Sequence, residues 1–569
     1  MKYDKVALKE LNMKNTNSKL IFALLILTFV FAGPLSAQAA DHYVSPTGAA
    51  SWANCLSATP LSGTAACSLS TANTNAAAGD TVYLRAGTYT TGIAPSKSGT
   101  SAARIIYQNY GGEVVTLSAS TAISLNGKNY VTVTGINAGP CKHCLSIKNG
   151  NYNIIAYGTF GPYSSPGDGQ WELNVVDTNS QYNWLHHNTF HDFGACVGTP
   201  PNGDDQASVL DIGYESTADA GTRYNLIEDN VFYHGGHHAV ALQTGYNTFR
   251  NNYIHNEGWS NGAGNRNLYL NNLVSASQDV GHNIIEGNRL GYAAKPCDMI
   301  DVGNVAISTN YNMFRYNAVF HSNAWGIGTS AYGNPNSQGS YNHIYSNTVF
   351  NAGLVNAFTP LLDSATNPGE HSAINFINSA NKNNTAKNNL FYATKRGVLR
   401  GTAQEVANNW DGNTLGNPLF VSASTTLFDP YDTTQPNLNL QSTSPAIDQG
   451  GALTTVAAGD SGSGTSLVVA DSLYFQDGSY APPGTVQADW IAVGTVGNIV
   501  QISSINHSTN TITLASSISR TSGNPVWLYK KSDGVRVLYG SAPDAGAYEY
   551  SSSTSIMRPS APTNLQVLP

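Results

Sequence analysis

Tyr182-Asn183-Trp184-Leu185-His186-His187-Asn188 is the clearest copy of a phrase that recurs through the middle of the chain. The phrase is an aromatic or polar residue, then Asn, then four residues with apolar members among them, then Asn again. Its core is short, and successive copies start 22 to 42 residues apart. A solenoid has this pattern, because each coil stacks on the preceding one while its loops vary in length. The copies begin at Tyr182, Tyr224, Tyr246, His282, Tyr311, Tyr341 and, more faintly, Asn383.

The residues that follow each phrase indicate strands. Short runs such as Val231-Phe232, Tyr253-Ile254 and Thr348-Val349-Phe350 come after the second Asn. β-Branched and aromatic residues in such runs suit a pleated surface that is buried on one side. Asn at the same place in every coil predicts a ladder of amides that bond to backbone groups and tolerate left-handed φ. We therefore predict an all-β fold, a right-handed single-stranded parallel β-helix, in preference to an Asn-rich β-sandwich.

The composition narrows the choice of partners. Of the 569 residues, 11% are charged and the formal net charge is -8, whereas about 25% charged residues is usual for soluble domains. A surface of amides, hydroxyls and aromatic rings suits hydroxyl-rich ligands such as polysaccharides, and it equally suits any extracellular β-protein. No run of basic residues is present. This argues against nucleic acid as a partner, because phosphate binding needs clustered Lys and Arg.

The first 39 residues have the pattern of a signal peptide. Lys14 and Lys19 precede an apolar stretch at residues 20–32, and a small-residue cleavage site, Ala37-Gln38-Ala39, follows it. The apolar stretch is shorter than the ~20 residues of a membrane span. We expect a mature chain that begins near Ala40 and is secreted, periplasmic or held at the cell surface. We also expect it to be a monomer with no stable membrane span.

The six cysteines suit an oxidising compartment. Cys55 and Cys67 are close in the sequence, and we predict that they form a disulfide. Cys141 and Cys144 make a CxxC, but no thioredoxin-like βαβ pattern surrounds it, so we expect no redox role. The sequence leaves open the pairing of four cysteines, Cys141, Cys144, Cys196 and Cys297.

Several phrases resemble those of a known superfamily. Residues 78–89 read AGDTVYLRAGTY, residues 43–48 read YVSPTG, residues 444–450 read SPAIDQG and residues 544–550 read DAGAYEY. These phrases resemble the opening and closing coils of secreted right-handed β-helix proteins of the pectate-lyase-like superfamily. The resemblance covers roughly residues 41–450 and 536–550. It implies the fold and a cleft across the middle coils, but such motifs are poor markers of the substrate.

The expected domain organisation follows from these phrases. Residues 451–535 lose the Asn phrase and gain hairpin signals. We expect them to form a small antiparallel β module that caps the solenoid, with carbohydrate binding as the alternative role. The expected parts are a signal peptide at 1–39, the β-helix at 40–450, the inserted module at 451–535, a closing strand at 536–550 and a Ser/Pro-rich linker tail at 551–569.

A candidate site follows from aligning the coils on the apolar residues that precede each phrase. The alignment predicts an inward stack of Leu210, Leu242, Leu270 and Ile300, and strand alternation turns the neighbouring side chains outward. One outward column then holds Asp205, His237, Asn265 and Lys295, and another holds Asp211, Gln243, Asn271 and Asp301. His238 and Arg266 lie next to the first column, and the loop residues Glu257 and Trp259 overhang it.

This face has the groups that β-elimination on a uronate polymer needs. The uronate carboxylate must be neutralised, by Arg or by a cation, before a base removes the proton at C5. We assign Lys295 or Arg266 to that proton, with His237 or His238 assisting. Asp205, Asp211 and Asp301 would hold Ca²⁺ or the sugar hydroxyls. The remaining candidates for contact with the substrate are Asn265, Asn271, Gln243, Trp259 and Glu257.

The sequence therefore favours a secreted polysaccharide lyase that acts on an acidic polysaccharide. One alternative is a glycoside hydrolase on the same fold, with Asp205, Asp211 and Asp301 supplying the acid and the base. Another is a non-catalytic extracellular protein that binds glycan or spaces other modules. Four further histidines follow the apolar runs of their coils, and we interpret them as a structural stack in preference to a functional row: His191, His234, His255 and His321.

Overall fold

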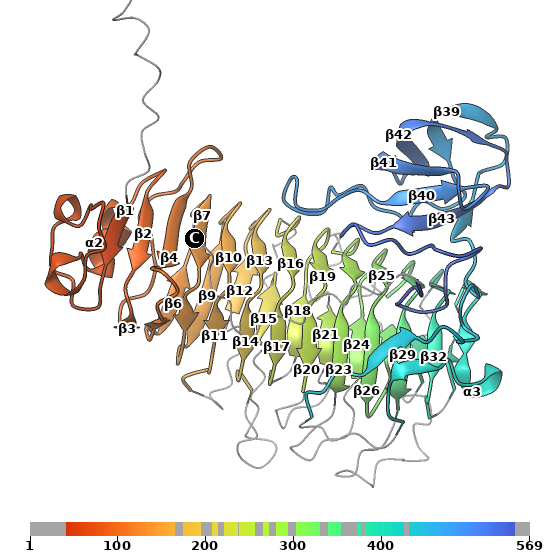
Figure 1. The fold of residues 1–569 in the computed structure, drawn as a ribbon, viewed down its shortest axis with the longest axis horizontal. Coiled ribbons are helices and arrows are strands. Elements are labelled where there is room, and N and C mark those ends of the chain that lie inside the picture. The colour runs from red at the N-terminus through yellow and green to blue at the C-terminus, as the bar shows by residue number, and fades with distance from the viewer. Residues whose placement is uncertain are drawn as a thin grey trace, which may run out of the picture. The chain divides into compact units, whose positions relative to one another are not determined.

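The fold is that of a computed structural model, shown in Figure 1. It describes residues 41–165, 174–194, 208–213, 221–236, 238–256, 266–271, 280–293, 303–329, 339–353, 372–376, 382–395, 397–401, 403–425 and 432–551.

Three long parallel sheets run through the described part of the chain, and the coils between the first and last ones contribute one strand to each of them in turn. Sheet A consists of β1(Asp41–Val44), β2(Thr81–Leu84), β4(Ile105–Asn109), β7(Val131–Thr134), β10(Ile154–Ala156), β13(Trp184–His186), β16(Leu226–Glu228), β19(Thr248–Arg250), β22(Ile284–Glu286), β25(Met313–Arg315), β28(His343–Tyr345), β31(Thr385–Lys387) and β34(Glu405–Ala407).

Sheet B follows sheet A in each coil. It consists of β3(Gly87–Tyr89), β5(Val115–Leu117), β8(Asn137–Ala138), β11(Thr159–Phe160), β14(Thr189–His191), β17(Val231–Tyr233), β20(Tyr253–His255), β23(Arg289–Ala293), β26(Ala318–Ser322), β29(Thr348–Ala352), β32(Leu390–Tyr392) and β35(Trp410–Asp411). Sheet C consists of β6(Thr121–Ser124), β9(His143–Lys148), β12(Asn174–Asp177), β15(Leu210–Ile212), β18(His238–Leu242), β21(Arg266–Leu270), β24(Gly303–Ile307), β27(Ile327–Thr329), β30(Ile374–Phe376) and β33(Leu399–Arg400).

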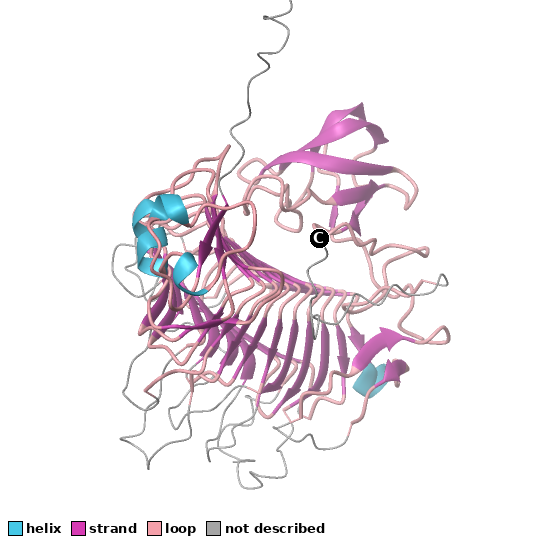
Figure 2. Cartoon of the chain, turned by 60° about the vertical axis from the view of Figure 1, so that its left-hand side comes forward, coloured by secondary structure: helices cyan, strands magenta, loops and turns pink. Residues whose placement is uncertain are grey.

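This arrangement is the right-handed parallel β-helix that the sequence predicts. The strands are short because each coil turns three corners, and their inward residues form one continuous apolar core. Aromatic rings stack along this core, with centroids 4.7 Å apart between Phe160 and Phe190 and 5.2 Å apart between Phe190 and Phe232. The short helices α2(Leu69–Asn75) and α3(Gly412–Leu415) lie beside the first and last coils (Figures 1 and 2), as do the 3-10 turns η1(Trp52–Asn54) and η2(Gly63–Ala65) near the start.

Both Asn residues of the recurring phrase form ladders that join the coils. In the ladder between sheets A and B, the backbone N–H of Asn188 donates to Oδ1 of Asn230 at 2.9 Å, and Asn230 does the same to Asn252. The second ladder lies between sheets C and A and repeats the same bond. Its rungs are Asn153, Asn183, Asn225, Asn247, Asn283, Asn312, Asn342 and Asn384. The predicted Asn ladder is therefore confirmed.

The left-handed backbone position is not at the ladder Asn, as we expected, but at the residue before it. Tyr182, Tyr224 and Tyr246 have φ of 56°, 62° and 60°. This conformation turns their rings outward in register, so that they stack on one another from coil to coil. The aromatic ladder contains Tyr130, Tyr152, Tyr182, Tyr224, Tyr246, His282, Tyr311 and Tyr341, with centroids 4.8 to 6.2 Å apart.

The C-terminal module is an antiparallel sheet, as predicted. Its strand order is β38-β43-β40-β41-β42-β39. A hairpin of the kind expected within residues 451–535 is formed by β41 and β42. The strands are β38(Thr454–Thr455), β39(Gly462–Val468), β40(Trp490–Val493), β41(Ile499–Asn506), β42(Thr511–Arg520) and β43(Pro525–Lys530), and a separate antiparallel pair before them consists of β36(Phe420–Ser422) and β37(Asn437–Leu440).

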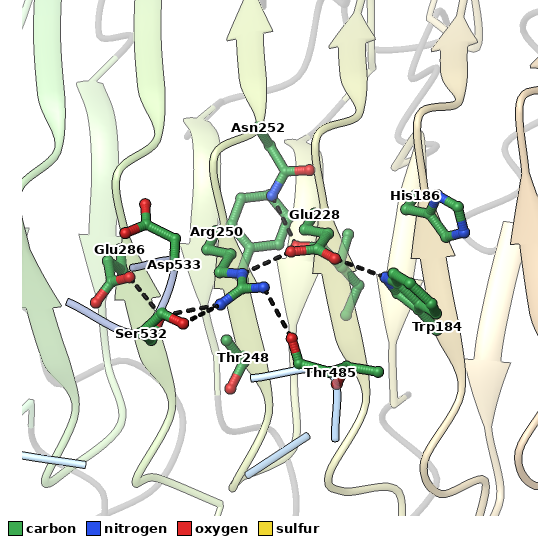
Figure 3. A network of polar contacts seen from close by, with 12 residues as sticks. Trp184, His186, Glu228, Thr248, Arg250, Asn252, Glu286, Thr485, Ser532 and Asp533 are labelled. Atoms are coloured by element: carbon green, nitrogen blue, oxygen red, sulfur yellow. Dashed lines mark hydrogen bonds and ion pairs between the residues drawn. The ribbon is translucent and has the colours of Figure 1, made fainter. Parts of the chain in front are cut away.

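The module packs on the outer face of sheet A along the middle and later coils, rather than across the end of the solenoid as we expected (Figure 1). Arg315 on β25 binds both oxygens of Asp489 in the module, at 2.6 and 2.8 Å, and its Nε donates to Glu286. Arg250 on β19 donates to Ser532, whose hydroxyl donates to Glu286 (Figure 3). These buried ion pairs fix which coils the module covers.

The predicted disulfide between Cys55 and Cys67 is present, with Cα atoms 5.5 Å apart. Cys141 and Cys144 pair with each other. Cys196 and Cys297 lie outside the described residues. Within the part of the chain that is described, no helix is long and apolar enough to cross a membrane.

Candidate functional site

The register of sheet C decides which of the predicted site residues share a column. Leu242 pairs with Leu270 as predicted, but its partner on β15 is Ile212 rather than Leu210. Leu210 pairs with Val240, two residues before Leu242, its predicted partner. The residue that pairs with Leu270 on the following coil is Ile307, where we predicted Ile300. The coil lengths vary, so spacing alone did not fix the register. A shift by two residues keeps each side chain on the same face, and Asp211 still points away from the core.

The shift separates Asp211 from the column of Gln243 and Asn271. Asp211 lies beside Ala241 and Tyr269, whereas Gln243 and Asn271 are neighbours in the next column. Gln243 still reaches Asp211, because its Nε2 donates to Oδ1 at 3.3 Å. The three side chains are 2 to 5% exposed. Oε1 of Gln243 and Oδ1 of Asn271 are buried with no hydrogen-bond partner among the described residues.

His238 and Arg266 are neighbours, as predicted, at the other end of the same strands. The ring of His238 packs edge-on against Tyr269, with centroids 4.5 Å apart. The guanidinium of Arg266 lies over the ring of Trp325, 4.4 Å from its centroid. The stacking fixes the direction of a cation that is only partly buried.

Seven of the predicted site residues lie outside the described residues, and their roles stay predictions. They are Lys295, His237, Asp205, Asp301, Asn265, Trp259 and Glu257.

The histidines predicted to be a structural stack form two adjacent columns at the end of sheet B. His191, Tyr233 and His255 share one column, with ring centroids 5.3 and 5.0 Å apart. The next residue of each coil forms the second column, at a left-handed turn, and this column contains Asp192, His234, Asn256, Tyr292, His321 and Asn351. The single row that we predicted is therefore two rows, and a carboxylate stands at the start of the second.

Asp192 binds two of these imidazoles. Its Oδ2 lies 2.8 Å from Nδ1 of His191, and its Oδ1 lies 2.5 Å from Nδ1 of His234 on the next coil. The Asp192 side chain is 44% exposed, His234 26% and His191 16%. This is an ionisable cluster that solvent reaches, in contrast with the buried carboxylate and amides on sheet C.

The hydrogen bonds to Asp192 set the tautomer of each imidazole ring. They hold the pKa of Asp192 well below its usual range, because the ionised carboxylate accepts from both imidazoles. An ionised carboxylate has no proton to give, so each ring donates from Nδ1. The Nε2 of a neutral His191 or His234 is then the basic atom. A carboxylate that orients imidazole in this way is a common device of acid–base catalysis.

Tyr233 lies among these groups. Its ring stacks between His191 and His255 and meets His234 edge-on, with centroids 4.8 Å apart. Burial raises the pKa of Tyr233, and the charge of Asp192 adds to the effect. Burial lowers the pKa of His255 to about 4, so this ring is neutral at ordinary pH.

We group the residues at the turn from sheet B to sheet C under one name, the B–C corner: His191, Asp192, Tyr233, His234, His238 and Arg266. The corner is where each coil passes from sheet B to sheet C. His234 and His238 are four residues apart in one coil, and Arg266 begins the sheet C strand of the next. Gln243 is five residues beyond His238, roughly 16 Å along an extended strand. The buried oxygens of Gln243 and Asn271 are therefore out of reach of a sugar unit bound at His238. Asp211, in the column of Ala241, is three residues or about 10 Å along the strand from that position.

Comparison with known proteins finds likeness in structure only. No family model and no curated protein sequence matches the chain. Among solved structures, the pectate lyase Pel9A is 15% identical over 74% of this chain and 94% of its own, with a TM-score of 0.36. The PL6 family alginate lyase AlyGC is 15% identical over 65% of this chain and 51% of its own, with a TM-score of 0.38.

A third match is the catalytic domain of a GH87 α-1,3-glucanase, 12% identical over 57% of this chain and 64% of its own, with a TM-score of 0.31. The match to the alginate lyase AlyGC spans about half the length of that protein. The chain has the fold of a right-handed parallel β-helix. That assignment rests on the three parallel sheets and the Asn ladders, and the low identities leave the chemistry to be argued from the residues.

Proposed function

We propose that the protein is a secreted, carbohydrate-active lyase that cleaves an acidic polysaccharide by β-elimination at the B–C corner. The observation that carries the proposal is the pair of imidazoles bound to Asp192 in a part of the surface that solvent reaches. A base with an oriented lone pair is what removal of a sugar C–H proton needs. Arg266 on the neighbouring coil supplies a positive charge for the uronate carboxylate.

The reaction has three parts in this proposal. Arg266 pairs with the carboxylate at C6 and makes the proton at C5 more acidic. Nε2 of His234 takes this proton, and the electrons of the C–H bond form the double bond between C4 and C5 while the bond from C4 to the glycosidic oxygen breaks. Tyr233, whose raised pKa keeps its hydroxyl protonated, gives a proton to the leaving oxygen. Asp192 is a positioning residue, since it touches the imidazoles and not the sugar.

Ca²⁺ has a separate place in this proposal. The oxygens of Asp211, Gln243 and Asn271 are of the kind that Ca²⁺ binds, and two of them are buried acceptors without a partner among the described residues. The described residues contain no group of three or more His, Cys, Asp or Glu side chains that would hold a metal. A cation bound by the oxygens of Gln243 and Asn271 would neutralise a neighbouring sugar of the polymer, because these two residues follow the end of the strands that begin at His238 and Arg266.

The test is to incubate the mature protein with acidic and neutral polysaccharides, with and without a chelator, and to follow the absorbance of unsaturated uronide products. We expect product from a uronate polymer and none from neutral ones. Asp192→Asn should lower kcat by about 10²–10⁴ with KM little changed, because the Asn amide would donate to Nδ1 and enforce the wrong tautomer. The low-pH limb of the rate profile should also move, which a purely structural role would not cause.

Asp471→Asn is a matched control. Asp471 also binds a histidine, His343, at 2.8 Å, but it does so where the module meets sheet A. We expect the Asp471→Asn variant to be as active as the wild type. Cleavage without absorbance would instead support the glycoside hydrolase. The absence of any product from every polysaccharide would refute catalysis and leave the glycan-binding alternative.

A further inference from the structure

Trp325 stands close to Arg266 in the register of sheet C, although the two residues are on different coils. Arg266 on β21 pairs with Gly303 on β24. Two residues after Gly303, Val305 pairs with Ile327 on β27, and this register places Trp325 beside Gly303. Arg266, Gly303 and Trp325 therefore follow one another over three successive coils. Neighbouring strands are about 4.8 Å apart, so the backbones of Arg266 and Trp325 are about 10 Å apart.

The indole of Trp325 reaches across the coil between them, because two glycines make room for it. A Cβ at Gly303 would lie 2.5 Å from Cε2 and Nε1 of the indole, and a Cβ at Gly328 would lie 2.6 Å from Nε1. Gly328 is in the outward column that contains Tyr269, so the ring lies on the outer face of sheet C. Its Nε1 donates to the carbonyl of Val305 at 2.9 Å. The ring is therefore fixed over β24, and a side chain at either glycine would displace it.

The guanidinium of Arg266 lies over this fixed ring, 4.4 Å from its centroid. Trp325 is 5% exposed, so its ring cannot itself offer a face to a sugar. Any effect of Trp325 on a ligand would pass through Arg266, which is half-buried. A guanidinium is planar, and one that packs by its face on an aromatic ring still presents its N–H groups edge-on. These groups form the fork that binds both oxygens of a carboxylate.

We propose that Trp325 is a positioning residue for Arg266, and that the pair recognises the carboxylate of a uronate through the guanidinium. The proposal rests on the proposed function in one respect, since it takes the carboxylate at C6 to be the ligand of Arg266. The indole holds the cation in one direction before the substrate binds, so less side-chain freedom is lost on binding. Lys in place of Arg266 would keep the charge, but it would lose the flat contact with the ring and the paired N–H groups.

The test is titration calorimetry with oligogalacturonate, oligomannuronate and oligoguluronate as probes. All the proteins carry Asp192→Asn, so that cleavage does not consume the probe. We expect Arg266→Gln to weaken the binding of a uronate probe, and Trp325→Leu to weaken it about tenfold. With Arg266→Gln already in place, Trp325→Leu should have no further effect, because the indole acts only through that guanidinium. A merely structural role would weaken binding in both backgrounds.

Two more variants complete the design. Gly303→Ala disturbs the same contact without changing either partner, because its Cβ would displace the ring. It should also weaken binding, and it carries the test if the Trp325→Leu variant does not fold. Trp490→Leu is the matched control, since it removes another indole that lies under a cation, Lys530, at 4.6 Å in the module. It should leave the binding of the uronate probe unchanged.

Three results would overturn the proposal: no binding of any uronate probe, binding that Trp325→Leu and Gly303→Ala leave intact, or an equal loss from Trp325→Leu with and without Arg266→Gln. Product from uronate polymers is measured separately, on proteins with Asp192 intact. Coupled binding without any product would refute the proposed lyase and leave this pairing standing. Product together with uncoupled binding would refute the pairing and leave the lyase standing.

Discussion

Arg315→Met is expected to loosen the module from sheet A. The Arg315, Glu286 and Asp489 side chains are 0% exposed, and Arg315 is held by both carboxylates and by the hydroxyl of Tyr345. The pKa of Arg315 stays above its usual value although burial alone would lower it, because Asp489 and Glu286 lie against it. Its removal leaves two buried carboxylates without that cation, and breaking a buried pair in this way costs about 3–5 kcal/mol.

Hydrogen exchange measures this cost locally, in peptides from β40 and β43. A loss of about 4 kcal/mol in the free energy of opening corresponds to exchange roughly 10³-fold faster. Arg85→Met is the control. It removes an ion pair to Glu113 whose side chains are 20% and 25% exposed, in an early coil, and it should leave module exchange unchanged. A change below about tenfold in the Arg315→Met variant would refute the reasoning. Replacing both carboxylates by apolar residues as well should restore much of the protection.

Two further predictions concern the solenoid and its closing segment. Asn288→Ala removes a fully buried ladder residue that bonds Asn252, Phe249 and Asn317. We expect denaturant titration to show a free energy of unfolding lower by about 2–4 kcal/mol. An equally stable variant would contradict the role of the ladder. Burial raises the pKa of Glu549 to about 8, with a further contribution from nearby Asp544. The folded state thus holds this proton more tightly than the unfolded state, so the stability that it contributes is complete below pH ~4.5 and is lost as the pH rises towards 8. Glu549→Gln should flatten this part of the curve of unfolding free energy against pH, and an unchanged curve would count against it.

The repeat was readable from the sequence because it rests on local chemistry. An Asn that bonds the next coil and an apolar residue that fills the core must recur at the same place in every coil, and both patterns survive loops of any length. The side that each residue faces followed from strand alternation, which is why Asp211 was placed outward even though its column was wrong by two residues. The position of the left-handed turn was missed, since Tyr is uncommon at positive φ and the sequence pointed to the Asn that follows it.

The contacts that make the candidate site were beyond the reach of sequence patterns. Asp192 and His234 are 42 residues apart, and they meet because their two successive coils stack in register. The one local signal was Asp192 directly after His191, a carboxylate in a row of otherwise neutral turn residues. The docking of the module joins Arg315 to Asp489 across 174 residues. Nothing in the sequence around Asp489 indicates that its carboxylate binds Arg315. We therefore expected the module to cap the end of the solenoid.

The two Asn ladders also bear on how the length of this solenoid can change. From Asn188 to Asn389 the junctions between coils use the same bond, from a backbone N–H to the Oδ1 of the next Asn, so a coil duplicated or deleted there would meet chemically identical neighbours on both sides. The module removes this freedom where it is attached, because Arg250 and Arg315 must stay two coils apart to reach their partners. Length variation among descendants of such a chain should therefore avoid the coils that the module covers. The number of coils under the module should stay the same.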